Sequence, residues 1–110
     1  MIIHENEWHW GKSVDIVGYG GASIVHLSFE KVNPGVCYLS GLSVTDGYRR
    51  RGLATRLLEE SERLCLKRGI FRIDLSSVQT DYVHQFYLKH GYVDIKEEDG
   101  FIQMYKLLRL

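Results

Sequence analysis

Apolar and polar residues alternate along several short stretches of this chain, which is the pattern of β-strands with one buried face. Five stretches either follow this period or are rich in β-branched and aromatic residues, and we expect strands over residues 13–17, 24–29, 36–44, 70–78 and 101–107. The segment Gly18-Tyr19-Gly20-Gly21 separates the first two and predicts a hairpin turn between them.

Two segments repeat their apolar residues every three to four positions, which predicts amphipathic helices. The first covers residues 52–68, and Lys67-Arg68-Gly69 is a typical C-terminal signal for it. Its apolar face is formed by Leu53, Leu57, Leu58, Leu64 and Cys65. A second, shorter helix ends at Gly91 and has an apolar face formed by Val83, Phe86 and Tyr87. No helical period precedes residue 47.

Length and composition are those of a soluble globular protein, and we expect a single domain over residues 1–110. The formal net charge is zero, so no global field draws the chain to nucleic acid or to a membrane surface. The first residues contain no long apolar run, and we expect a cytoplasmic location. Cys37 and Cys65 lie in apolar patterns and are expected to be buried thiols rather than a disulfide framework.

The region between the third strand and the first helix carries the clearest chemical signal. The polar turn Thr45-Asp46-Gly47 leads into Arg49-Arg50-Arg51-Gly52-Leu53-Ala54, which opens the helix. A helix start has unpaired N–H groups and partial positive charge, and Gly52 lets a ligand approach the backbone. The segment therefore predicts an anion-binding turn. It lacks the lysine of a Walker loop and the three glycines of a Rossmann fingerprint.

These residues resemble the acyl-CoA-binding signature of the GNAT superfamily of N-acetyltransferases, Arg/Gln-x-x-Gly-x-Gly/Ala, which Arg49, Gly52 and Ala54 match. The segment from Phe86 to Tyr92 resembles a second family motif, and the two occur in the family's order. The resemblance implies an α/β (α+β) fold with a mixed, mostly antiparallel central sheet flanked by helices. The family normally has two helices after its first strand, and this chain is expected to lack them or to keep only a remnant.

The resemblance further implies binding of acetyl-CoA as a co-substrate, with transfer of its acetyl group to an amine by direct attack in a ternary complex. It implies that the end of the strand at residues 36–44 pairs with the pantetheine arm, and that a splay between this strand and the one at residues 70–78 makes the cleft. It also implies that the turn holds the pyrophosphate. The residues expected to bind the co-substrate are Leu42, Ser43, Val44, Arg49, Arg50, Arg51, Gly52, Leu53, Ala54, Thr55 and Thr80. Thr80 stands where the family commonly has Asn, and it can also cap the second helix.

Tyr87 is the expected catalytic side chain, because the matching tyrosine in many family members donates a proton to the departing thiolate. A packed core tyrosine is the alternative for this position, and we interpret Phe86 as structural. The sequence does not single out a general base. The candidates are Glu30, His26, His84 and the group His4, Glu5, Glu7 and His9. Their spacing does not fit a metal site, and no metal is expected.

Two other classes of function compete with an enzyme. A catalytically inactive acyl-CoA-binding or interaction module of the same fold fits the missing helices and the absent base. A nucleic-acid binder that uses the arginines fits the neutral charge poorly. The acceptor amine remains open. Apolar residues near both ends of the chain, together with a sheet that lacks its usual helices, lead us to expect a homodimer.

Overall fold

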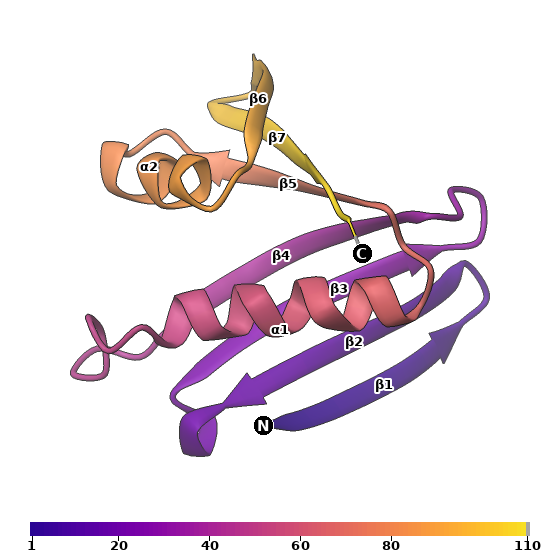
Figure 1. Cartoon of the computed structure of the whole chain (residues 1–110), viewed down its shortest axis with the longest axis horizontal. Helices are drawn as coiled ribbons and strands as arrows, with labels where there is room; N and C mark the ends of the chain where they lie inside the picture. The colour runs from indigo at the N-terminus through magenta and orange to yellow at the C-terminus, as the bar shows by residue number, and fades with distance from the viewer. Residues whose placement is uncertain (110) are drawn as a thin grey trace.

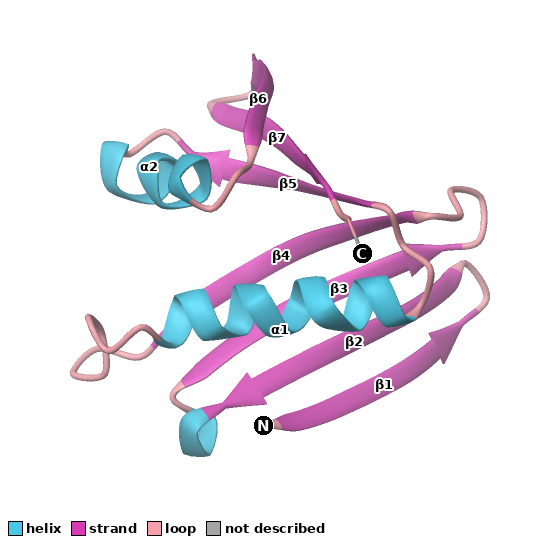
Figure 2. Cartoon of the chain, viewed as in Figure 1, coloured by secondary structure: helices cyan, strands magenta, loops and turns pink. Residues whose placement is uncertain are grey.

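The computed structural model describes residues 1–109, which form one seven-stranded sheet and two α-helices (Figures 1 and 2). The strands lie in the order β1-β2-β3-β4-β5-β7-β6. The elements are β1 (Ile2–Trp8), β2 (Gly11–Gly18), the 3-10 helix η1 (Tyr19–Gly21), β3 (Ser23–Glu30), β4 (Val36–Val44), α1 (Leu53–Lys67), β5 (Arg72–Val78), α2 (Asp81–Lys89), β6 (Val93–Glu98) and β7 (Phe101–Leu107). Only the β4–β5 pair is parallel, so the predicted fold class is confirmed.

The five predicted strands all form, and β4 has the predicted bounds. Two strands were not predicted, namely β1 and β6. Both lie at the edges of the sheet, and every residue in each of them is exposed. Without a buried face a strand has no need to alternate apolar and polar residues, so the period that reveals the inner strands is missing from both.

The first four strands form an antiparallel meander with short connections. Only His9 and Trp10 lie between β1 and β2, so in the described chain no helix lies between the first strand and the second. The predicted hairpin turn is the 3-10 helix η1, which joins β2 to β3. It is the one helical turn before residue 47 in the described chain, as the sequence led us to expect.

Helix α1 begins directly after Gly52, whose φ of 73° is in the left-handed region that glycine tolerates best. Four of the five residues of its predicted apolar face are buried, with Cys65 fully enclosed, and Leu64 is partly buried against the core. The helix ends at Lys67 with Arg68 as its C-cap, and the backbone N–H groups of Gly69 and Ile70 donate to the carbonyls of Leu66 and Cys65. This is a glycine-type helix end, and the sequence prediction is correct to within one residue.

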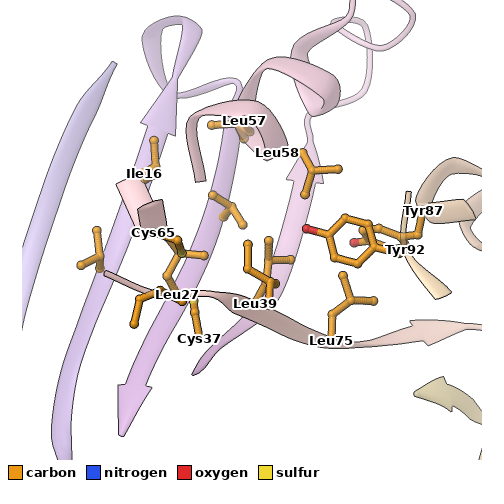
Figure 3. Close-up of a cluster of buried hydrophobic side chains, with 14 of the residues drawn as sticks. Ile16, Leu27, Cys37, Leu39, Leu57, Leu58, Cys65, Leu75, Tyr87 and Tyr92 are labelled. Carbon is orange, nitrogen blue, oxygen red and sulfur yellow. The ribbon is translucent and has the colours of Figure 1, made fainter. Parts of the chain in front are cut away.

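Both α-helices pack on the same face of the sheet. Figure 1 shows α1 lying across β2, β3 and β4, and α2 beside β5. One cluster of buried side chains joins them, and in Figure 3 Leu58 and Leu75 gather around Tyr87 and Tyr92. Strand residues that alternate with this cluster point to the opposite face of the sheet.

The parallel pair β4–β5 is joined over only part of its length. Residues Val36 to Leu39 pair with Arg72 to Leu75, and the two strands have no paired residues beyond that point. The end of β4 keeps its partner on the other side, because Ser43 pairs with Ile24 and Val44 with Ser23 of β3. The sheet therefore splays between β4 and β5, next to the start of α1.

Candidate active site

The loop after β4 presents an uninterrupted series of free backbone donors. Arg50 and Gly52 both have positive φ, 65° and 73°, which turns the chain sharply before α1. No backbone carbonyl or side chain within the described chain accepts a hydrogen bond from the N–H groups of residues 49–55. Successive N–H groups in such a turn form a concave anion receptor, and the helix dipole adds positive potential there.

The three arginines of this loop have different environments. Arg49 pairs with Asp46 at 3.1 Å and its Nε donates to the carbonyl of Val44 at 3.3 Å, which fastens the loop to the end of β4. The guanidinium of Arg51 lies 5.2 Å from the ring centroid of Tyr48. Arg50 has no salt bridge to any residue in the range 1–109, so its charge is available to a ligand.

A cleft with a volume of about 440 Å³ opens between the end of β4, this loop and helix α2. One wall consists of residues at the splayed end of β4, and the second is the turn that opens α1. The third wall is one side of α2. The lining residues are Leu42, Ser43, Val44, Tyr48, Arg49, Arg50, Gly52, Leu53, Ala54, Thr55, Tyr82, Val83, Phe86 and Tyr87.

Tyr87 lies at the inner end of the α2 wall, where 8% of the residue is exposed. Its ring packs edge-to-face on Phe86 and on Tyr92, with centroids 5.3 Å and 5.7 Å away. The hydroxyl makes no hydrogen bond within residues 1–109, yet its oxygen is not sealed from solvent. Burial raises the pKa of the Tyr87 phenol above its usual value near 10, so the hydroxyl carries its proton at neutral pH.

A family model for the GNAT acetyltransferase family matches residues 3–92, which is most of the chain. The chain belongs to the GNAT family. This membership confirms the resemblance drawn from the two motifs and assigns the chain to a family of acetyltransferases that use acyl-CoA. No curated protein shows a significant sequence match to it.

Solved GNAT-type structures share the fold. The PaiA N-acetyltransferase of Thermoplasma acidophilum, solved in complex with coenzyme A, has a TM-score of 0.74 at 20% identity, over 86% of this chain and 59% of that chain. A GNAT-family acetyltransferase from Streptococcus pneumoniae has a TM-score of 0.73 at 24% identity, over 89% and 66%. An acetyltransferase from Bacillus cereus ATCC 14579 has a TM-score of 0.68 at 25% identity, over 96% and 74%.

The structure of this GNAT chain brings together most of the residues that the motifs predicted. All of them except Arg51 and Thr80 line the cleft. The side chain of Arg51 turns toward Tyr48 and Tyr19 instead. Thr80 occupies the N-cap position of α2, but its side chain makes no capping hydrogen bond. Its expected contact with the co-substrate stays a prediction.

Sequence reasoning missed two aromatic residues that line the cleft and gave a third, Phe86, a structural role alone. Tyr48 and Tyr82 were not predicted, because exposed aromatic residues in a loop and at a helix start leave no periodic signal. Phe86 was interpreted as structural. It packs against the core and also lines the cleft, since its ring lies on the boundary between the two.

A hydrogen-bonded chain closes the base of the splay on the sheet face away from the helices. The Ser76 hydroxyl donates to Oε1 of Gln103 at 2.7 Å, so the Tyr38 hydroxyl donates to Ser76 at 2.9 Å. Tyr38 and Ser76 belong to β4 and β5, one on each side of the point where pairing stops. The contact fixes where the two strands separate.

Metal sites and membrane-spanning helices are two further features to consider in this chain. Within residues 1–109, no three His, Cys, Asp or Glu side chains are close enough together to hold a metal ion. No helix there is long and apolar enough to cross a membrane.

Proposed function

We propose that this GNAT chain is an acetyl-CoA-dependent N-acetyltransferase that transfers the acetyl group to an amine by direct attack in a ternary complex. The observation that carries the proposal is one cleft lined by three features that the reaction requires. Within residues 1–109 these are a turn of free N–H groups, an unpaired strand edge and a tyrosine hydroxyl without a hydrogen-bond partner.

Each wall of the cleft suits one part of acetyl-CoA. The free N–H groups of residues 51–55 bind the pyrophosphate, and the guanidinium of Arg50, which lines the cleft, adds a charge-assisted contact. Contacts from the side chains of Arg49 and Arg51 stay predictions. The amides of the pantetheine arm pair with the open edge of residues 42–44, as an added strand would. The PaiA structure solved with coenzyme A has the same fold, which supports this arrangement. Thr80 is included as a further contact, next to the α2 wall.

The chemistry follows from the inner end of the cleft. The neutral amine forms a C–N bond to the thioester carbonyl carbon, the C–S bond breaks, and the amine gives up one proton to a base. Tyr87 donates its proton to the departing sulfur. Its raised pKa keeps the phenol protonated at neutral pH, so the donor is present when the bond breaks. Neither Cys37 nor Cys65 lines the cleft, so a covalent acyl-cysteine has no support.

A module that binds acyl-CoA without transferring the acetyl group is the second candidate. It is favoured by the connection between β1 and β2, where the described chain has two residues and no helix. One face of the sheet is therefore left without a covering helix. If the protein is an enzyme, this is the face on which the acceptor must bind.

Thiol release from acetyl-CoA, measured across a panel of amines, separates the two candidates. The panel contains a polyamine, an amino sugar, an Nα-blocked lysine and a peptide with a free N-terminus. An enzyme releases thiol in step with the appearance of acetylated amine by mass spectrometry. Binding of acetyl-CoA with no release above the rate without protein supports the inactive module instead. No binding at millimolar acetyl-CoA contradicts both.

A further inference from the structure

The sheet face opposite to both helices carries a histidine–aspartate pair. His26 of β3 and Asp15 of β2 are directly paired residues, and His26 Nδ1 lies within hydrogen-bonding distance of Asp15 Oδ1. Their neighbours Val14, Val25 and Leu27 point into the core, so this pair points the other way. The side chains of His26 and Asp15 remain 47% and 32% exposed.

This pairing determines which imidazole nitrogen can accept a proton. An ionised carboxylate only accepts hydrogen bonds, so Nδ1 of His26 carries the proton and donates it to Asp15. In the neutral ring the lone pair is then on Nε2. Tyr38 and Ser76 lie on the same face but are neutral and bonded to each other, so they do not compete for this role.

The free nitrogen of His26 lies against the strand that forms the cleft wall. The pairing of β3 with β4 is irregular here, because Ile24 pairs with Ser43 while His26 pairs with Ser40. The extra residue on β4 allows Gly41 to adopt a φ of 61°. A methyl group at Gly41 would lie 2.6 Å from Cδ2 of His26 and 3.4 Å from Nε2, so the ring packs directly on this glycine. The next residue along β4, Leu42, lines the cleft.

We propose that His26, oriented by Asp15, is the general base of the transfer and that the acceptor amine arrives from the uncovered face of the sheet. This inference rests on the proposed function. Nε2 of His26 takes the proton that the amine nitrogen loses as its bond to the carbonyl carbon forms. The C–S bond breaks at the same carbon, and the proton of Tyr87 goes to sulfur. The proton from the amine and the proton for the sulfur are thus transferred on opposite sides of the splay.

The other candidate bases from the sequence lie elsewhere. Glu30 pairs with Gly11 at the far end of β3, and Nε2 of His84 donates to Oδ1 of Asp94 at 2.8 Å between α2 and β6. His4 is the residue on β1 opposite Asp15, so it faces the carboxylate from the side away from β4. The titratable groups around His26 are therefore Asp15 and, beyond it, His4. Its partner on β4, Ser40, is uncharged.

The test compares two nucleophiles in His26→Gln, Asp15→Asn and the matched control His84→Gln, which breaks the second histidine–aspartate pair. Both nucleophiles lose a proton from nitrogen as the C–N bond forms. The nitrogen of hydroxylamine is far less basic than that of spermidine, so its adduct gives this proton up readily to water and depends less on a positioned base. His26→Gln should lower kcat/KM with spermidine by about 10²–10⁴-fold, with a much smaller loss for hydroxylamine. Asp15→Asn should lower kcat, and His84→Gln should not.

Two results would overturn the inference while leaving the proposed function intact. One is a wild-type rate with spermidine in His26→Gln. The other is an equal loss for both nucleophiles, which indicates damage to the fold or to acetyl-CoA binding. A wild-type protein that binds acetyl-CoA but releases no thiol with hydroxylamine or with any amine of the panel contradicts the enzyme itself. Imidazole ¹⁵N spectra give a readout without turnover: His26 should be the Nδ1–H tautomer, and the Nε2–H tautomer contradicts the role assigned to Asp15.

Discussion

Thr55 and His90 join two walls of the cleft. Thr55 Oγ1 in the first turn of α1 lies 3.2 Å from Nε2 of His90, the residue that follows α2. Nδ1 of the same ring donates to the carbonyl of Phe86 at 2.7 Å, so in the neutral ring Nε2 accepts from the threonine hydroxyl. The turn that holds the free N–H groups is thereby connected to the helix that carries Tyr87.

Removing this hydroxyl should loosen the cleft. Thr55→Val keeps the shape and the backbone N–H but leaves Nε2 of His90 without its donor, which should lower the free energy of unfolding by about 1–2 kcal/mol. For a chain of this length, thermal unfolding should then occur about 4 °C or more below the wild type. Thr55→Ser keeps the hydroxyl and is the control. Equal melting temperatures for the valine and serine variants would show that the contact contributes nothing.

Gly52 and Gly69 form a matched pair for testing the anion receptor. They flank α1 with φ values of 73° and 74°, and a Cβ at either would meet no atom within 4 Å. Replacing each by Gln should therefore strain the backbone to a similar extent. Only Gly52 lines the cleft, so only Gly52→Gln should also block the approach of a phosphate.

The readout is the stabilisation that acetyl-CoA gives on thermal unfolding. In the wild type it should reach roughly 2.7 kcal/mol at a hundredfold excess over Kd. Gly69→Gln should keep this stabilisation by acetyl-CoA, measured relative to the same variant without ligand. Gly52→Gln should lose it. If both variants keep the stabilisation by acetyl-CoA, the turn before α1 is not the phosphate-binding site.

Tyr87→Phe should separate binding from chemistry. The change removes one hydroxyl that has no hydrogen-bond partner within residues 1–109, so both the fold and the stabilisation by acetyl-CoA should persist. The chemical step should slow by about 10²–10⁴-fold, because the departing sulfur loses its proton donor. An unchanged rate, under conditions where the chemical step limits turnover, would show that Tyr87 has only a structural role.

The same residue predicts a pH dependence. A general acid must be protonated to act, and burial raises the pKa of Tyr87. Activity should therefore show no decrease assignable to this phenol up to about pH 10, the ordinary value, and should fall only above it. A decrease at neutral pH that disappears in Tyr87→Phe would contradict the assignment.

The edge of the sheet leads to a prediction about assembly. All of β1 is exposed; Ile2 and Ile3 remain 59% and 54% accessible at its start, and Trp8 is exposed at its end. A bare edge strand with apolar residues is usually covered, most often by a two-fold partner. We predict a homodimer with twice the chain mass of 12.8 kDa in light scattering, and a monomer after Ile3→Lys. A wild-type monomer across micromolar concentrations would exclude it.

The inner part of the fold could be predicted from sequence because burial leaves a period. Strand β4 and helix α1 each have one enclosed face, and their bounds were predicted to within one residue. The edge strands β1 and β6 have no enclosed face and were missed. The splay between β4 and β5 was expected from the family resemblance alone, since no local pattern records where a pairing stops.

The candidate site divides in the same way. Its loop was predicted because Arg49, Gly52 and Ala54 are close together in sequence. The pairing of His26 with Asp15 depends on how β2 and β3 align across the turn at η1. The hairpin was predicted, but its register was not defined by the sequence. Only a defined register shows that His26 and Asp15 are opposite each other.

Backbone amide NMR with acetyl-CoA tests the central claim most directly, because it reports which N–H groups meet the co-substrate. The amide signals of residues 51–55 should move most, followed by those of residues 42–44 at the open edge of β4, and Gly52→Gln should abolish both sets of shifts. Shifts confined to other parts of the chain, or none at millimolar acetyl-CoA, would contradict the assignment of this cleft.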